Sequence, residues 1–139
     1  MGQCWTKSSK QSTINDTAPD LAGGNVHLVT TMDKWEKETS EANMDGKVVV
    51  VNFSASWCNP CRQIAPAYRE LADKYSSILF LTVDVDELAE FSTTWDVKAT
   101  PTFFFLRDGR QLDKLVGAKK EELHKKIMDI AESNTRSQN

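Results

Sequence analysis

The sequence has few cysteines and no long hydrophobic run. Of its 139 residues only three are cysteine, namely Cys4, Cys58 and Cys61, and this sparse, odd count does not fit the disulfide framework of a secreted protein. No apolar run approaches about 18 residues, the length expected of a membrane-spanning helix, and the N-terminus lacks the apolar core of a secretory signal. We therefore expect a cytoplasmic protein, in which a close cysteine pair is more often catalytic or metal-binding than structural.

The chain also lacks an excess of basic residues. Its 17 Lys and Arg residues and 20 Asp and Glu residues give a formal net charge of −3. The basic residues are scattered rather than gathered into a stripe, so no nucleic-acid partner is expected. The Gly-x-Gly-x-x-Gly, P-loop and His-Glu-x-x-His motifs are absent as well. We therefore expect no metal, nucleotide or flavin cofactor.

The hydrophobic pattern from residue 25 onward predicts an α/β domain. Residues 1 to about 24 are polar and end in Gly-Gly, which predicts a flexible extension. Short β-branched runs then alternate with helical periodicity in the order βαβαβαββα. The predicted elements cover 26–29, 32–42, 47–53, 58–75, 78–83, 87–95, 102–106 and 111–116, followed by a last helix with Leu123, Ile127, Ile130 and Ala131 facing inward. This order predicts a central mixed five-stranded sheet flanked by helices. The domain would cover 25–135, with a disordered tail at 136–139.

A Cys-x-x-Cys pair lies between the most apolar predicted strand and the helix after it. The i, i+3 spacing of Cys58 and Cys61 on a helix places their Cβ atoms about 5–6 Å apart, near bridging range. Unpaired N–H groups and the dipole at a helix N-terminus favour the thiolate of Cys58, near the exposed first turn. Pro60 suits that turn, because its missing N–H costs no hydrogen bond. The pattern predicts thiol–disulfide exchange, with Cys58 as the nucleophile and Cys61 as the resolving thiol.

Other interpretations of the pair are weaker. Zinc needs about four ligands, and beyond the pair the chain offers only Cys4, His27 and His124, which are distant and in no paired spacing. Two inert structural thiols are disfavoured by the adjacent Trp57 and Pro60 and by the strand-to-helix setting. A docking or chaperone-like module with little redox turnover is the alternative from another class, because a fold alone does not fix a function.

The segment Trp57-Cys58-Asn59-Pro60-Cys61 resembles the Trp-Cys-Gly-Pro-Cys motif of thioredoxins. Further similar segments follow at matching separations, namely Val83–Asp86, Thr100–Thr102, Asp108-Gly109 and Val116–Ala118. The resemblance covers residues 25 to 135. Phe53–Trp57 and Val83–Leu88 are most similar to plant h-type thioredoxins, and the Met-Gly-x-Cys start and Asn52 are similar to a subgroup of these with an N-terminal extension.

The resemblance implies a thioredoxin fold and a set of residues around the cysteines. Pro101 would be the family's cis-proline, facing the pair and presenting its backbone to the substrate. The residues that would position the substrate are Trp57, Asn59, Pro60, Thr100, Pro101 and Gly117. The resemblance also implies disulfide-bearing target proteins as substrates, with electrons supplied by NADPH and thioredoxin reductase or by glutathione and glutaredoxin.

Two asparagines depart from the family pattern. Most thioredoxins carry a buried Asp six residues before the nucleophile, where this chain has Asn52, and an amide cannot titrate. We expect Asn52 either to hold a water that relays the proton of Cys61, or to be a satisfied polar residue of the sheet. Asn59 replaces the usual Gly between the cysteines, a position that tunes the balance between dithiol and disulfide; the direction of that shift does not follow from the sequence.

The first six residues carry a modification pattern. Met1-Gly2-Gln3-Cys4-Trp5-Thr6 fits N-myristoylation on Gly2. One myristoyl chain binds membranes only marginally, so stable peripheral association would need palmitoylation of Cys4 as well. Alternatively, the free thiol of Cys4 on a flexible arm would reach the active site and serve as a third redox cysteine. The resemblance supports this relay, since some extended h-type members are thought to accept electrons from glutathione and glutaredoxin. An ordinary free cysteine is the remaining interpretation.

Overall fold

The computed structural model of the protein describes residues 23–138. The extension expected over residues 1–24, with Gly2 and Cys4, therefore lies almost wholly outside the described residues. The elements in chain order are β1 (Val26–Val29), α3 (Met32–Met44), β2 (Val48–Ser54), α4 (Asn59–Lys74), β3 (Leu79–Asp84), α5 (Ala89–Thr94), β4 (Thr102–Arg107), β5 (Arg110–Val116) and α6 (Lys120–Gln138). This order confirms the one predicted from the hydrophobic pattern.

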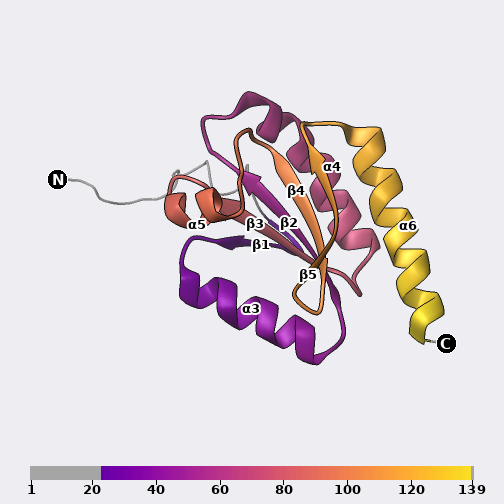
Figure 1. Ribbon diagram of the computed structural model, residues 1–139. Coiled ribbons are helices and arrows are strands. Elements are labelled where there is room, and N and C mark those ends of the chain that lie inside the picture. Colours follow the sequence, from indigo (N-terminus) through magenta and orange to yellow (C-terminus); the bar gives the residue numbers. More distant parts are fainter. Residues whose placement is uncertain (1–22, 139) are drawn as a thin grey trace.

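The five strands form one mixed sheet in the order β1-β3-β2-β4-β5. Strands β1, β3 and β2 are parallel neighbours, whereas β4 is antiparallel to both β2 and β5. Helices α4 and α6 cover one face of the sheet, and α3 and α5 cover the other (Figure 1). The predicted five-stranded sheet flanked by helices is confirmed.

Strand β2 is central to the sheet, and all seven of its residues are buried. Successive side chains of a strand point to opposite faces, and the valines follow this rule. Val48 and Val50 pack in the core under α4 and α6, whereas Val49 and Val51 pack in the core under α3 and α5. A continuous β-branched run is therefore what a strand covered on both faces requires.

The last two strands and the last helix complete the fold. Asp108 and Gly109 join β4 to β5 with φ values of 53° and 78°, the left-handed conformation that a two-residue hairpin turn needs and that an Asp-Gly pair supplies. Of the four residues predicted to face inward on α6, Leu123 and Ile127 are fully buried, and Ile130 and Ala131 are partly buried against the same core. The helix continues to Gln138, past residue 135, where the sequence analysis places the end of the domain.

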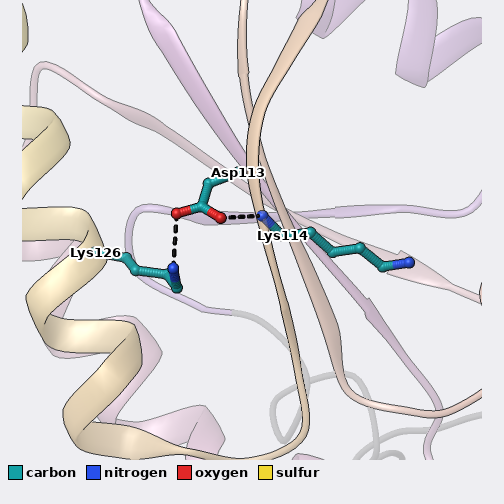
Figure 2. A network of polar contacts seen from close by, with 3 residues as sticks. All are labelled: Asp113, Lys114 and Lys126. Carbon is teal, nitrogen blue, oxygen red and sulfur yellow. Dashed lines mark hydrogen bonds and ion pairs between the residues drawn. The ribbon is translucent and has the colours of Figure 1, made fainter.

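A polar network ties α6 to the edge strand β5 (Figure 2). Lys126 donates to Oδ2 of Asp113 over 2.7 Å, and the backbone N–H of Lys114 donates to Oδ1 over 2.8 Å. The hydrogen bond from Lys126 holds the pKa of the Asp113 carboxyl below its usual range. Both side chains are partly exposed, so solvent screens the pair and it fixes the helix position more than it stabilises the fold.

Tyr68, a residue of α4, has the largest of the fully buried side chains among the described residues. Its hydroxyl donates to the carbonyl oxygens of Leu81, at 2.7 Å, and Val50, at 3.0 Å. Desolvation raises the pKa of the phenol well above its ordinary value of 10.0. The hydroxyl thus joins α4, the helix that begins at the cysteine pair, to both β2 and β3.

We expect Tyr68→Phe to lower the free energy of unfolding by about 1 kcal/mol at neutral pH, because the buried carbonyls lose a donor. The native state favours the neutral phenol, so this contribution is complete below pH 10.0 and is lost as the pH rises through the native-state pKa. The difference between wild type and variant should therefore shrink in alkali. Urea unfolding of both proteins at neutral and at alkaline pH measures this difference in the free energy of unfolding, and Tyr75→Phe is the partly buried control. A difference that grows in alkali would contradict a native state that favours the neutral phenol.

Candidate functional site

The cysteine pair lies at the carboxyl edge of the parallel strands, between β2 and α4. Cys58 is the N-cap residue of α4, and Cys61 lies in the first turn. The two are joined in a disulfide with their Cα atoms 5.3 Å apart, as the predicted i, i+3 spacing allows. On one side β2 adjoins the parallel strand β3, and on the other the antiparallel strand β4, so the pair lies where the strand direction changes.

The backbone at the start of α4 polarises the sulfur of Cys58. The N–H of Cys61 donates to Cys58 Sγ over 3.2 Å, in the role that an oxygen plays at most N-caps. This donor and the positive end of the helix dipole both favour negative charge on the sulfur. The carbonyl oxygen of Thr100 lies 3.5 Å from the same atom. The sulfur thus has two polar neighbours, a donor that favours a thiolate and an acceptor that favours a thiol.

Both cysteines are buried, with Cys58 4% and Cys61 1% exposed. Cys58 lies at the first turn of the helix, as predicted, and its neighbours in the sequence, Trp57, Asn59 and Pro60, are exposed, whereas its own side chain is not. The two cysteines pack with Ala55 and against Val85, whose N–H donates to the carbonyl oxygen of Ser54 at the end of β2 over 2.9 Å. The difference in burial alone does not distinguish the nucleophile from the resolving thiol.

Two backbone segments meet beside the disulfide. The Thr100–Pro101 peptide bond is cis, as the resemblance implies, and Pro101 is itself buried. The N–H of Gly117 donates to the Pro101 carbonyl over 2.8 Å, and Gly117 has a φ of 103°, which favours glycine. The structure therefore brings Thr100, Pro101 and Gly117 together next to Cys58, from two loops far apart in the sequence.

Trp57 is the large apolar side chain on the surface of the site, and it is 66% exposed. Its indole Nε1 donates to Oδ2 of Asp86 over 2.8 Å. Asp86 is in turn held by the carboxylate of Asp84, which accepts from the N–H of Asp86 over 2.9 Å. The indole is thus exposed to a partner yet fixed in orientation. Asn59 and Pro60 lie beside it on the surface.

Asp86 is a site residue that the sequence analysis missed. Its segment entered only as part of a matching stretch, and no motif marks the side chain itself. The available signal was topological: Asp86 follows the carboxyl end of β3, which neighbours β2. Residues at the carboxyl ends of adjacent parallel strands meet at one edge, so this position was a candidate neighbour of Trp57.

Asn52 is buried in β2, with 2% of its surface exposed. By strand alternation Asn52 and Ser54 share a face with Val50, the face that α4 covers. Within residues 23–138, Asn52 Oδ1 and Ser54 Oγ have no hydrogen-bond partner. Such buried acceptors are normally satisfied by protein or by ordered water. The described protein groups therefore leave two polar atoms on the side of the sheet that faces the helix of Cys61.

Among residues 23–138, no three His, Cys, Asp or Glu side chains lie close enough together to hold a metal ion. No helix among those residues is long and apolar enough to cross a membrane. His27 lies 2.5 Å from Glu38, where it links β1 to α3.

The fold and the buried Cys-x-x-Cys disulfide at a helix N-terminus define a dithiol–disulfide oxidoreductase. The thioredoxin family model matches residues 26–129. A thioredoxin H-type of Populus jackii is 58% identical over 133 residues, covering 96% of each chain, and thioredoxin H9 of Arabidopsis thaliana is 52% identical over 134 residues, covering 96% of this chain and 94% of its own. The crystal structure of a poplar wild-type thioredoxin h superimposes on this chain with a TM-score of 0.76 and is 64% identical in sequence. The match covers 77% of this chain and 96% of the poplar chain.

The chain belongs to the thioredoxin family, and its relatives named above are plant h-type thioredoxins. It is therefore a protein-disulfide reductase that acts through the Cys58–Cys61 dithiol, and its substrates are disulfide-bearing proteins. The family implies thioredoxin reductase as a source of electrons, and thioredoxins need no bound cofactor.

Proposed function

We propose that Cys58 is the nucleophile of this reductase and Cys61 the resolving thiol. The observation that carries this assignment is the Cys61 N–H that donates to Cys58 Sγ at the helix N-terminus. The Cys58 thiolate attacks one sulfur of the target disulfide, the target S–S bond breaks, and the departing thiolate takes a proton. Cys61, deprotonated, then attacks Cys58 Sγ, and the second target sulfur leaves. Two electrons pass to the target, and the Cys58–Cys61 disulfide remains.

We further propose that the surface around the sulfur positions the target chain. Thr100, Pro101 and Gly117 would present backbone groups on one side of Cys58, and Trp57 would supply an apolar face on the other. This assignment is supported by the short Gly117 to Pro101 hydrogen bond and by the fixed, exposed indole. The exposed residues between the cysteines, Asn59 and Pro60, would border the same surface.

We propose that Asn52 holds a water that takes the proton of Cys61. The unpartnered Oδ1 of Asn52, on the face covered by α4, supports this. Asn52→Asp would place a titratable group there, and burial would raise the pKa of its carboxyl. We expect the pH profile of turnover to differ between the variant and the wild type from about pH 5 to 9, because the new carboxyl adds its own titration to that of the cysteines. Disulfide-reduction rates across this range, with Ser54→Ala as the control, measure it, and superimposable profiles would contradict the relay.

We propose that Cys4 acts as a third redox cysteine and that the chain belongs to the h-type subgroup with a Met-Gly-x-Cys extension. The described chain begins beside Arg69 of α4, about 15 Å along the helix from Asn59. About 19 residues separate Cys4 from Gly23, and a flexible linker of this length would span about 24 Å on average. This span exceeds the distance of about 15 Å along α4 from Arg69 to Asn59. Cys4 would attack the Cys58–Cys61 disulfide, and glutathione with glutaredoxin would reduce the new disulfide that Cys4 forms.

The choice of electron donor tests the relay. We expect glutathione and glutaredoxin to drive reduction of a protein disulfide by the wild type, and Cys4→Ser to lower that rate at least about tenfold, because the intramolecular step is lost. NADPH and thioredoxin reductase should drive both proteins equally and serve as the control. Equal rates with glutaredoxin would show that Cys4 is not part of the electron path.

Acylation is the competing fate of the same N-terminus. Myristoylation of Gly2 together with palmitoylation of Cys4 would hold the otherwise cytoplasmic protein at a membrane surface. An acylated Cys4 has no thiol, so one molecule serves either the membrane or the relay. The mass of the protein isolated from its own cells distinguishes the two forms.

A further inference from the structure

A surface groove lies between the start of α3 and the segment from Asp86 to Thr94, which includes α5. We call it the acidic groove. It has a volume of about 520 Å³, and its lining residues are Met32, Asp86, Glu87, Leu88, Ala89, Glu90, Phe91 and Thr94. The parallel strands β1, β3 and β2 are neighbours in that order, so the segments after their carboxyl ends lie along one edge. Those segments carry Met32, Asp86 and Cys58 respectively.

The acidic groove is continuous with the surface that receives the target disulfide. Asp86 forms part of its wall and also accepts the hydrogen bond of the Trp57 indole. Trp57 directly precedes Cys58. A polypeptide whose disulfide sulfur reaches Cys58 and whose chain continues past Trp57 therefore enters the acidic groove.

The groove combines an apolar floor with an acidic rim. Leu88 is almost fully buried, Phe91 is partly buried, and Met32 is 38% exposed. The side chains of Asp86, Glu87 and Glu90 are exposed, and none of the described residues that line the groove is Lys or Arg. Three carboxylates around an apolar surface attract a cationic chain and repel an anionic one.

We propose that the acidic groove binds the part of a target polypeptide next to its disulfide, and that it selects segments that combine an apolar side chain with basic ones. This inference rests on the proposed function, because the groove becomes a specificity surface only if Cys58 receives the target sulfur. The apolar side chain would cover Met32 and Leu88, and the basic side chains would lie near Glu87 and Glu90.

Three synthetic peptides that share one intramolecular disulfide loop test the inference. They carry Lys-Leu-Lys, Glu-Leu-Glu or Lys-Ser-Lys on both sides of the loop, and the rate constant for their reduction by the full-length dithiol protein is measured at low salt. We expect the Lys-Leu-Lys peptide to react about tenfold faster than the Glu-Leu-Glu peptide. The preference should fall to about threefold or less in Glu87→Gln/Glu90→Gln. Glu121→Gln/Glu122→Gln, an equal change of charge at the start of α6, is the matched control and should keep the wild-type ratio.

Met32→Ser tests the apolar floor. We expect the wild type to reduce the Lys-Leu-Lys peptide about threefold faster than the Lys-Ser-Lys peptide, and Met32→Ser to lose most of this preference. The variant should keep the preference for the Lys-Leu-Lys peptide over the Glu-Leu-Glu peptide. If the ratio of the rate constants for the Lys-Leu-Lys and Glu-Leu-Glu peptides is the same in the wild type and in Glu87→Gln/Glu90→Gln, the inference is overturned while the reductase function stands. A ratio that changes as much in full-length Lys7→Gln/Lys10→Gln would also overturn it, because the chain's own N-terminal segment would then occupy the groove. If the wild type reduces none of the peptides, the proposed function itself fails.

Discussion

Cys58→Ser is expected to abolish reduction of protein disulfides, with a fall in rate of at least about three orders of magnitude. The attacking species is a thiolate, which the Cys61 N–H and the dipole of α4 stabilise at the Cys58 sulfur. A serine hydroxyl at the same N-cap accepts the same hydrogen bond, but it does not ionise near neutral pH and cannot form a disulfide. The variant therefore keeps the local backbone structure and loses the chemistry. Insulin reduction with NADPH and thioredoxin reductase measures the loss.

The control for this variant is a test of folding. Because Ser is among the preferred N-cap residues, Cys58→Ser should unfold in urea at a midpoint close to that of the wild type held in the dithiol form. A variant that is folded and still reduces insulin at a tenth of the wild-type rate or more would place the nucleophile at another cysteine. Cys4 would then be the residue to replace next.

Much of the site followed from local sequence. The β-branched run that forms β2 predicts a buried strand, and the periodicity of Ile64, Tyr68, Leu71 and Tyr75 predicts an amphipathic helix after it. The first three of these side chains are buried on α4, and Tyr75, the C-cap residue, is partly buried. Pro60 and the cysteine spacing predict where that helix begins, and Cys58 is indeed its N-cap. These features depend on neighbours within a few residues, so a single sequence is enough to reveal them.

Features that depend on distant contacts did not follow from local sequence. Trp57 and Asp86 are 29 residues apart, and no periodicity links them. The burial of Cys58 was also missed, because it depends on how Val85 packs at the end of a neighbouring strand. The position of Pro101 beside Cys58 was expected only through the resemblance, since the tertiary fold, and not the sequence of its loop, brings a residue 43 positions later next to the nucleophile. These contacts depend on the order of the strands in the sheet, which local sequence does not predict.

Cys61→Ser is expected to convert the reductase into a protein that stays covalently joined to its targets. Cys58 is unchanged and still attacks, so the first S–S bond forms at close to the wild-type rate. A serine hydroxyl in place of the buried Cys61 sulfur cannot attack that bond, and the mixed disulfide persists. Non-reducing electrophoresis and mass spectrometry should show complexes that disappear on treatment with dithiothreitol. Cys58→Ser/Cys61→Ser is the control and should form none through this site.

The lifetime of these complexes also shows whether Cys4 can attack the mixed disulfide at Cys58 when Cys61 is absent. If Cys61 is the resolving thiol and Cys4 reaches Cys58, the Cys61→Ser complex should still decay slowly, as Cys4 attacks Cys58 Sγ and releases the target thiol. The complex of Cys4→Ser/Cys61→Ser should then last at least about tenfold longer. Equal lifetimes in the two variants would remove Cys4 from the electron path without affecting the roles of Cys58 and Cys61. Rapid release of the target from both variants would instead show that an external thiol, and not Cys61, resolves the mixed disulfide.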